Sequence, residues 1–515
     1  MLPAINGRLK QQEGWFSLAQ EVLTVSFGGF APWCAAAFAK RLGATVQESQ
    51  TGQIMLLRDD SLPPEAYVLT VTAEGIRVQV ACEQSVILAL TTLYQLMDGQ
   101  RRVPCLSLTD APRYQHRGLS LDCVRCFFPV GEVRRVIEQM ARVKLNVLHW
   151  VLTNDQGWRI ESRQYPRLNE ISGPYYTRDE IRNVVAYARE RGIEIIPEID
   201  MPGHMTALLA AYPEYSCSGK PVQLAKTGGI YPIILCAGAE KTYELIDSLL
   251  GEVCSLFPGG RIHLGGDEAP KREWKTCPCC QQRKRDEGLA DENELQGWFM
   301  NRAIAIGRTH GKQAICWNES LMGGNLDSSA AIQYWTVDQA EPTKVFLQKD
   351  GRLIYSDMFS LYLDYPTVCT PLSHVYGDAQ VLDDLDVSDK VYGVEACLWA
   401  EHVRDAESLE QLLFPRLYAF AEMAWSKSQD YADFRSRLPA FLQVHHPADM
   451  ALTPEDAWEA DMPDRIPWVL AHMQSITAAM SEEARASTMA AAEPTPAFRR
   501  RFASCFLGVT KGEES

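Results

Sequence analysis

The sequence predicts an α/β protein whose central part consists of eight parallel strands and their connecting helices. From about residue 116 onwards, short apolar runs recur along the chain, and several segments between them show helical periodicity. Because these runs are nearly continuous rather than alternating, they indicate a parallel sheet that is covered by helices. Eight strand–helix units over about 300 residues fit a (β/α)8 barrel, or TIM barrel, in which active sites lie at the carboxyl ends of the strands.

Local patterns place the elements of this barrel. Two segments each put four apolar residues on one helical face: Val133, Val136, Ile137 and Met140 in the first, and Ile181, Val184, Val185 and Ala188 in the second. The second helix opens with the capping box Thr177-x-x-Glu180 and closes before Gly192. We expect the strands at residues 118–123, 146–152, 194–200, 261–266, 313–317, 330–335, 352–357 and 392–399. An open doubly wound sheet is the alternative, but no Gly-x-Gly-x-x-Gly follows the first strand.

The regions on either side of the barrel differ from it in pattern. Residues 1–111 contain strand-like runs at 67–71 and 76–80 and a helical run at 85–97, so we expect a small non-catalytic α/β domain. Residues 104–112 are the predicted linker to the barrel domain at 112–430. Residues 431–515 are rich in Met and Ala and predict a helical C-terminal extension, which forms either an accessory lobe or the surface of a homodimer.

Composition excludes several classes of protein. A chain of 515 residues is too long for one hydrophobic core, so two or three domains are expected. The net charge of −16 repels phosphate backbones, which argues against a nucleic-acid partner. The apolar runs fall short of the roughly 18–20 residues that span a membrane, and the N-terminus lacks the pattern of a signal peptide. We therefore expect a cytoplasmic protein without a membrane partner.

The 15 cysteines are scattered and lie mostly in apolar segments, as is typical of a reducing compartment. The exception is Cys277-Pro278-Cys279-Cys280, which lies in a polar stretch. A zinc site needs four ligands, and no second Cys pair or His pair lies at the usual spacing. We therefore expect a surface loop with free or redox-labile thiols, no metal and no cofactor.

Polar and aromatic residues gather where the predicted strands end. They are Asn154, Asp155, Gln156, Glu198, Asp200, His204, Asp267, Glu268, Trp317, Glu319, Trp335, Asp357, Tyr362, Asp364, Trp399 and Glu401. A single Asp at such a position is usually a helix cap, but helix capping does not account for seven strands of eight. Carboxylates and aromatic rings without a Lys/Arg phosphate cradle suit a neutral, hydroxyl-rich ligand such as a sugar. Paired carboxylates also break glycosidic bonds.

Several of these residues belong to motifs that resemble family 20 glycoside hydrolases, the β-N-acetylhexosaminidases. The segment His263-Leu264-Gly265-Gly266-Asp267-Glu268-Ala269 is similar to the family signature. Other motifs match in the same order: Arg117-Gly118-x-x-x-Asp122-x-x-Arg125, His149-Trp150-x-x-Thr153-Asn154-Asp155-Gln156-Gly157-Trp158-Arg159, Pro197-Glu198-Ile199-Asp200-Met201-Pro202-Gly203-His204, Trp317-x-Glu319, Tyr362-x-Asp364, Trp399-x-Glu401 and Ala421-Glu422-x-Ala424-Trp425. The resemblance covers about residues 60–430.

The resemblance implies three catalytic residues. Glu268 would be the general acid, which protonates the leaving oxygen and later activates water. Asp267 would accept a hydrogen bond from the substrate's acetamide N–H and stabilise the oxazolinium charge, while Tyr362 would donate to the acetamide oxygen. The implied reaction is the exo-acting, retaining removal of a terminal GlcNAc or GalNAc by substrate-assisted catalysis, an exception to the scheme with two catalytic carboxylates.

The resemblance also implies which residues bind the sugar. Trp317, Trp335 and Trp399 would wall it, Arg125, Asp364 and Glu401 would bind its hydroxyls, and His204 would lie beside it. Asn154 and Asp200 would form a relay with His204 and Glu268, although the family pattern has Asp where this chain has Asn154. The expected partners are oligosaccharides or glycoconjugates that end in an N-acetylhexosamine.

Two other hypotheses remain open on the sequence. Asn154 allows a catalytically impaired sugar-binding protein on the same barrel. A barrel metallohydrolase would use His149, Asp200, His204 and Asp267, whose spacing matches no familiar metal motif. The preference between GlcNAc and GalNAc, the natural aglycone and the oligomeric state do not follow from the sequence.

Overall fold

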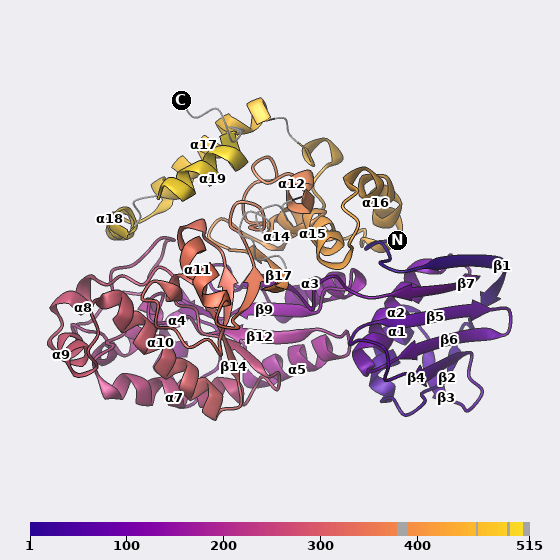
Figure 1. Cartoon of the computed structure of the whole chain (residues 1–515), viewed down its shortest axis with the longest axis horizontal. Coiled ribbons are helices and arrows are strands. Elements are labelled where there is room, and N and C mark those ends of the chain that lie inside the picture. The colour runs from indigo at the N-terminus through magenta and orange to yellow at the C-terminus, as the bar shows by residue number, and fades with distance from the viewer. Residues whose placement is uncertain (378–389, 460–461, 492–494, 508–515) are drawn as a thin grey trace.

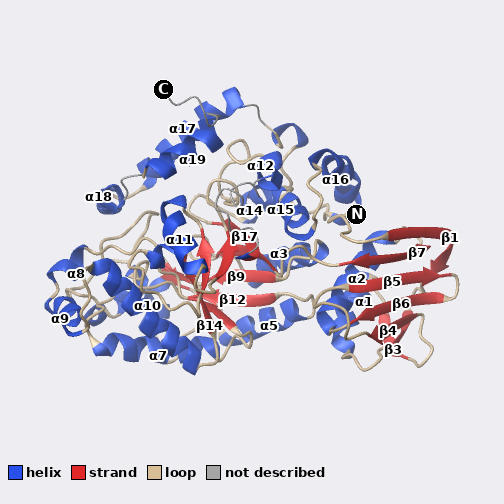
Figure 2. Ribbon diagram, viewed as in Figure 1, coloured by secondary structure: helices blue, strands red, loops and turns tan. Residues whose placement is uncertain are grey.

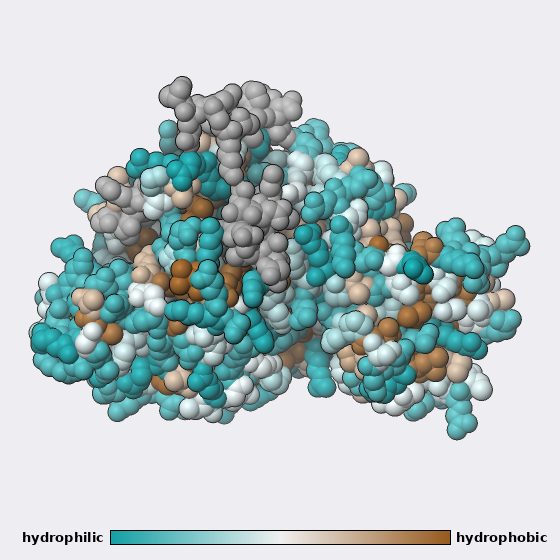
Figure 3. Space-filling view, in the orientation of Figure 1, coloured by the Kyte–Doolittle hydropathy of each residue, from teal (hydrophilic) through white to brown (hydrophobic). Residues whose placement is uncertain are grey.

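The computed structural model describes residues 1–377, 390–459, 462–491 and 495–507. It contains an N-terminal domain with a seven-stranded sheet, a closed barrel of eight strands, and helices at the C-terminus (Figures 1 and 2). The predicted fold class is therefore confirmed. The face drawn in Figure 3 is mainly hydrophilic, with small hydrophobic groups between the hydrophilic ones. Among the residues described, no helix combines the length and the apolar character that crossing a membrane requires.

The N-terminal sheet mixes parallel and antiparallel strands in the order β1-β7-β5-β6-β4-β2-β3. Helices α1 (Ala36–Arg41) and α2 (Glu83–Leu96) pack with the buried sides of these strands in one hydrophobic core. The predicted strands at 67–71 and 76–80 and the predicted helix at 85–97 correspond to β5, β6 and α2. The strands are β1 (Leu9–Ser17), β2 (Val22–Ser26), β3 (Thr45–Glu48), β4 (Ile54–Arg58), β5 (Tyr67–Thr72), β6 (Gly75–Val80) and β7 (Arg102–Asp110).

The predicted linker at residues 104–112 is wrong, because most of it belongs to strand β7. This strand pairs antiparallel with both β1 and β5. Pro104 suggested a break, since proline has no backbone N–H to donate to a neighbouring strand. In the structure Pro104 lies opposite Trp15 of β1, beyond Leu106, the last residue of β7 that pairs with β5. The strand therefore tolerates the proline near its start.

The barrel is closed by parallel strands in the order β12-β13-β14-β15-β16-β17-β8-β9. All eight predicted strands are confirmed. Several end earlier than predicted, because the chain turns away into the loops that carry Asp200, Asp267 and Asp357. The strands are β8 (His116–Asp122), β9 (Val147–Val151), β12 (Glu194–Glu198), β13 (Arg261–His263), β14 (Gln313–Trp317), β15 (Ala331–Tyr334), β16 (Arg352–Tyr355) and β17 (Val391–Leu398). A separate short hairpin joins β10 (Thr153–Asn154) to β11 (Gly157–Trp158).

Helices surround the barrel as the periodicity predicts. The apolar faces of α3 and α5 are buried, apart from the half-buried Val185, and the capping box of Thr177 and Glu180 is present. The longer helices are α3 (Val130–Arg142), α5 (Arg178–Arg189), α7 (Glu240–Cys254), α9 (Pro278–Asp286), α10 (Glu292–Thr309), α11 (Ala340–Leu347), α14 (Ala406–Leu413) and α15 (Arg416–Trp425). The shorter ones are α4 (Arg167–Ser172), α6 (Thr206–Ala211), α8 (Arg272–Thr276) and α12 (Leu372–Gly377).

The chain after the barrel forms α16 (Tyr431–His445), α17 (Met462–Ala479), α18 (Glu482–Ala491) and α19 (Pro496–Leu507). Helices α17 and α19 lie side by side and pack on the loop that follows β16 (Figure 1). The rings of Phe498 and Phe359 meet edge to face at 5.1 Å, and Arg501 Nη2 lies 2.9 Å from Asp357 Oδ2. The C-terminal helices therefore belong to the surroundings of the strand ends.

Candidate active site

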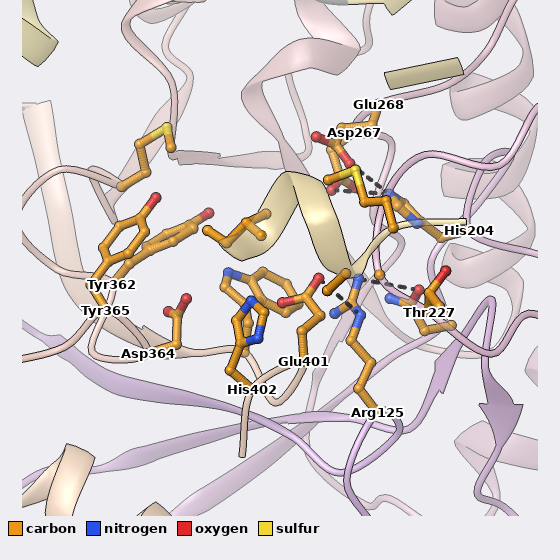
Figure 4. Close-up of a pocket in the computed structure, with 18 of the residues that line it drawn as sticks. Arg125, His204, Thr227, Asp267, Glu268, Tyr362, Asp364, Tyr365, Glu401 and His402 are labelled. Atoms are coloured by element: carbon orange, nitrogen blue, oxygen red, sulfur yellow. Dashed lines mark hydrogen bonds and ion pairs between the residues drawn. The ribbon is translucent and has the colours of Figure 1, made fainter. Parts of the chain in front are cut away.

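A cavity of about 380 Å³ lies at the carboxyl ends of the barrel strands (Figure 4). This volume falls in the range of small-molecule sites. The structure brings together here every predicted site residue except Trp317, from the loops after seven of the eight strands. They are Arg125, Asn154, Asp200, His204, Asp267, Glu268, Trp335, Tyr362, Asp364, Trp399 and Glu401.

Asp267 and Glu268 stand on a sharp turn after β13. Gly265 and Gly266 have positive φ angles of 66° and 100°, and a Cβ on Gly265 would lie 1.7 Å from Asp200 Oδ1, so only glycine fits there. Asp200 Oδ1 accepts the Gly266 N–H at 3.0 Å. Glu268 itself has a φ of 46°, and its N–H donates to Glu319 Oε2 at 2.7 Å. These contacts hold a strained backbone that aims both carboxylates at the cavity.

His204 links Asp267 and Glu268 to a third carboxylate. Its Nδ1 lies 2.9 Å from Asp155 Oδ2, and its Nε2 lies 3.2 Å from Glu268 Oε2 and 3.8 Å from Asp267 Oδ2. Burial opposes a charged ring, but the hydrogen bonds and charges of Asp155 and Glu268, together with Asp200, outweigh it and raise the pKa of His204 well above its ordinary value. These contacts therefore favour the imidazolium form of the ring.

The predicted relay through Asn154 is wrong, because Asp155 is the residue that holds His204. Asp155 also accepts from the backbone N–H and the hydroxyl of Thr206, at 3.1 and 2.5 Å. Asn154 Oδ1 instead accepts from the Asp155 N–H at 2.8 Å and from Arg125 Nη2 at 3.4 Å. Asn154 ends strand β10 and Asp155 begins the turn that follows, so the two side chains reach different partners and only Asp155 contacts the imidazole.

Several buried polar atoms at the cavity have no hydrogen-bond partner among the described residues: Asp267 Oδ1, Asp364 Oδ1 and Trp335 Nε1. Buried polar atoms are normally paired, so these atoms point to a ligand with matching polar groups. Burial raises the pKa of Asp267 well above its ordinary value, and the charge of Asp200 adds to this effect. Burial and then the charge of Glu401 raise the pKa of Asp364 to about 8. Both carboxyls lack the partner that a polar ligand would supply.

An ion-paired arginine also lines the cavity. Arg125 Nη1 contacts Asp122 Oδ2 at 3.0 Å, and its Nε lies 3.3 Å from Glu401 Oε1 (Figure 4). The guanidinium lies 5.3 Å from the centre of the Trp399 ring. Arg125, Glu401 and Asp364 together offer hydrogen-bond donors and acceptors for hydroxyl groups.

Aromatic rings form one wall of the cavity. Tyr362 stacks with Trp335 at 6.4 Å and meets the edge of Trp399 at 6.0 Å between ring centres. Trp317, which was predicted to wall the sugar, does not line the cavity. It is buried one layer below, 5.9 Å from the Trp399 ring, and its indole N–H donates to Glu198 Oε1 at 2.9 Å. That hydrogen bond draws Trp317 into the barrel interior, where it supports Trp399.

Sequence reasoning missed other residues at the site. Asp155 and Glu319 were visible in their motifs, but nothing in the sequence distinguished them from their neighbours. Burial, followed by the charge of Glu268, raises the pKa of Glu319 to about 7. The loop at 226–229 and the α17 residues Ile476 and Ala479 also line the cavity. These segments lie far from the barrel strands in sequence, and no motif marks them.

A metallohydrolase is disfavoured by what the candidate ligands already contact. Asp200, His204 and Asp267 do offer three ligand atoms within 4.8 Å of one another. However, both nitrogens of His204 face carboxylates, as described above. His149 lies inside the barrel between Glu198 and Glu395, at 3.1 and 2.7 Å. A metal ion would have to displace these contacts, whereas the same geometry suits proton transfer.

Comparisons with known proteins identify the family. The catalytic-domain model of glycosyl hydrolase family 20 matches residues 114–428, and the model of domain 2 of that family matches residues 7–111. A β-hexosaminidase of Porphyromonas gingivalis is 34% identical over 432 residues, which are 76% of this chain and 55% of that protein. The chain thus spans about half the length of this relative. A β-hexosaminidase of Akkermansia muciniphila is 33% identical over 75% of this chain and 85% of its own length.

Solved structures of the same family are also similar. The β-N-acetylhexosaminidase of Bacteroides fragilis aligns with a TM-score of 0.81 and 28% identity, over 88% of this chain and 97% of its own. The exo-β-N-acetylglucosaminidase of Vibrio harveyi, solved with N-acetylglucosamine, aligns with a TM-score of 0.79 and 28% identity, over 89% of this chain and 78% of its own. With a family model matched across the whole barrel, and with paired carboxylates at its strand ends, the chain belongs to glycosyl hydrolase family 20.

Proposed function

We propose that this protein is an exo-acting, retaining β-N-acetylhexosaminidase that releases terminal GlcNAc or GalNAc by substrate-assisted catalysis. One observation carries the proposal: two adjacent carboxylates face one cavity but differ in their exposure to solvent and in their hydrogen-bond partners. The Glu268 side chain is 33% exposed and contacts the His204 imidazolium, whereas the Asp267 side chain is 14% exposed and has an unpaired oxygen. Two such environments favour two different roles for the carboxylates.

Glu268 is suited to move the proton. It reaches the cavity, and His204 Nε2 lies 3.2 Å from its Oε2. When Glu268 donates its proton to the leaving oxygen, the charged imidazole stabilises the carboxylate that forms. Glu268 can then accept a proton from the water that completes hydrolysis, which is the second half of general acid–base catalysis.

Asp267 and Tyr362 are suited to hold the acetamide group. The unpaired Asp267 oxygen can accept the acetamide N–H, and the Tyr362 hydroxyl can donate to the acetamide oxygen, which then attacks the anomeric carbon. The cyclic intermediate carries a positive charge next to Asp267, and the Asp267 carboxylate that accepts the acetamide N–H stabilises this charge as it develops. Stabilisation that is confined to the transition state accelerates the chemical step.

The shape of the cavity supports action at a chain end. Its volume of about 380 Å³ leaves little space beyond one sugar ring, and Arg125, Asp364 and Glu401 line it on the side away from Glu268 (Figure 4). Similarity to a structure solved with N-acetylglucosamine supports the same substrate class. The catalytically impaired alternative rested on Asn154, and it loses its support because Asp155 provides the carboxylate beside His204.

The proposal is tested with matched aryl β-glycosides of GlcNAc and glucose. The glucoside lacks the attacking acetamide, so we expect kcat to fall by at least ~10³-fold while KM changes less. NMR should show the β-anomer as the first product of a β-glycoside, since two inversions restore the configuration. Comparable kcat on both sugars, or an initial α-anomer, contradicts the mechanism. Absence of any chromogenic release would support the sugar-binding alternative.

Two expectations from the sequence stay predictions: a cytoplasmic location and a homodimer. We propose both without a structural test. Fractionation of the native cell and light scattering of the purified chain would decide them.

A further inference from the structure

Four cysteine sulfurs meet at the start of helix α9. Cys217 and Cys280 lie 3.7 Å apart, and Cys236 lies 3.8 Å from both Cys277 and Cys280. All four sulfurs lie within 4.8 Å of one another. The expected surface loop at residues 277–280 is therefore wrong, because Cys277 and Cys280 are buried around the start of helix α9 and only Cys279 is exposed.

The four residues come from separate parts of the chain. Cys217 follows the short 3-10 helix Pro213–Tyr215, and Cys236 precedes α7. Cys217 is 63 residues from Cys280 in sequence, and Cys236 is 41 residues from Cys277. A search for regularly spaced pairs misses such ligands, which explains why the sequence predicted no metal.

The spacing of the sulfurs fits one metal ion. A tetrahedral site with metal–sulfur bonds of about 2.3 Å has sulfurs about 3.8 Å apart. Three of the sulfur–sulfur distances match this value. The sulfurs of Cys236 and Cys280 each lie at this distance from two other sulfurs. A disulfide joins only two sulfurs, at about 2.05 Å. Thiols are weak hydrogen-bonding groups, so four of them gain little by meeting unless an ion binds them.

The backbone around the cluster supports thiolates. Cys277 is the residue before Pro278, the first residue of α9, so the positive end of the helix faces the cluster. The Gly238 N–H donates to the Cys236 sulfur. A Cβ on Gly238 would lie 2.1 Å from the Cys279 carbonyl carbon, so the loop can approach α9 this closely only with glycine.

We propose that Cys217, Cys236, Cys277 and Cys280 bind one zinc ion as thiolates, in a closed structural site. Four sulfur ligands leave no open coordination position, and zinc prefers this tetrahedral sulfur environment. The thiol protons pass to solvent on binding, and no redox step is involved. This proposal goes beyond the catalytic function and does not depend on it.

The zinc ion would fasten a long loop to the catalytic side of the barrel. Residues 216–239 connect the end of the 3-10 helix to α7 with no helix of their own, and residues 226–229 in this loop line the cavity. On the other side, α8 and α9 follow directly after Asp267 and Glu268. A cross-link between these two segments restricts the unfolded chain and positions the loop in the folded one.

The test measures metal content in the purified full chain, without reference to activity. We expect about one zinc per chain by elemental analysis, and its loss in Cys236→Ser and Cys280→Ser. Cys279→Ser is the matched control, because it makes the same substitution at an exposed position of α9, the helix that holds Cys280. This control should retain zinc and Tm, whereas the two cluster variants should lose ~3 °C or more in Tm.

Measurements on the unmodified chain test the proposal even if the cysteine variants fail to fold. Titration of the folded protein with a mercurial reagent should release one zinc as four thiols react, and cobalt(II) in place of zinc should show thiolate charge-transfer absorption. The proposal is overturned by zinc below about 0.2 per chain after growth with zinc, by stoichiometric iron instead, or by a mass that shows a disulfide within the cluster. Retention of zinc in the Cys236→Ser/Cys280→Ser double variant also overturns it.

Discussion

Two clusters of buried carboxylates and imidazoles lie in the same barrel, yet only one of them faces a cavity. The core cluster, inside the barrel, consists of His116, His149, Glu198, His263 and Glu395. Glu395 contacts His116 and His149 at 2.7 Å, and Glu198 contacts His149 and His263 at 3.1 Å. The cavity cluster consists of Asp155, Asp200, His204, Asp267, Glu268 and Glu319, so five carboxylates share one imidazole.

The difference lies in the balance of charge. In the core cluster, burial raises the carboxylate pKa values, but the neighbouring imidazoles outweigh it and hold the pKa of Glu198 and of Glu395 below the ordinary value. In the cavity cluster, burial raises the pKa of Asp200 and of Glu319 to about 7, and neighbouring carboxylates add to the effect. A cluster in which every carboxylate contacts imidazoles stabilises the fold, whereas a cluster in which five carboxylates share one imidazole awaits a proton or a ligand.

Among changes that test this difference between the two clusters, removal of the proposed proton donor in the cavity cluster should have the largest effect. Glu268→Gln keeps the shape of the side chain but cannot protonate the leaving oxygen, so we expect kcat on natural glycosides to fall by at least ~10²-fold. Aryl glycosides with very acidic leaving groups need less protonation and should lose less in the first step. Steady-state kinetics across a series of leaving groups gives the comparison. A uniform loss across the series would mean that Glu268 is structural.

The corresponding change in the core cluster should reduce stability rather than chemistry. Glu395→Gln removes the charge that faces His116 and His149, and breaking a buried ion pair costs about 3 kcal/mol or more. Urea denaturation should show this loss, while kcat per folded molecule changes little. Glu407→Gln on the exposed side of α14 is the control for loss of a carboxylate. A selective loss of kcat without loss of stability would place the core cluster in the catalytic machinery.

Asp155→Asn should remove the carboxylate charge that favours the protonated form of His204. Without the Asp155 carboxylate the pKa of His204 falls towards its ordinary value, so the ring loses its charge at lower pH than in the unmodified protein. We expect the basic limb of the pH–rate profile to move to lower pH and kcat to fall roughly tenfold, which corresponds to ~1.4 kcal/mol. Asn154→Ala is the matched neighbour and should change KM without moving that limb. An unmoved limb in Asp155→Asn contradicts the coupling.

Asp200→Asn should change the pH dependence of stability. The folded pKa of Asp200 is raised to about 7 and exceeds its unfolded value near 3.8. The folded state therefore holds a proton that the unfolded state releases, and stability falls as pH rises from about 4 to about 7. The variant lacks this group, so its decline should be shallower by less than ~1.4 kcal/mol per pH unit. Denaturation at pH 5 and pH 7 tests this, and equal declines contradict it.

Much of the architecture followed from local patterns. Apolar runs and helical periodicity predicted all eight barrel strands and the capping box at Thr177, because period and capping depend on residues close in sequence. Parallel strands in a barrel all end on one face, so strand-end residues such as Asp267, Tyr362 and Glu401 could be assigned to one cavity before the fold was known.

Other features depend on contacts between distant parts of the chain. The sequence by itself determined where the eight strands lie along the chain, which polar and aromatic residues follow them, and that Asp267 and Glu268 are adjacent. Only the tertiary structure decided that Asp155 rather than Asn154 holds His204, that β7 is a strand of the N-terminal sheet, and that Cys217 and Cys236 meet Cys277 and Cys280. Side-chain direction at a strand end and the approach of segments tens of residues apart are set by packing of the whole chain, which no local pattern encodes.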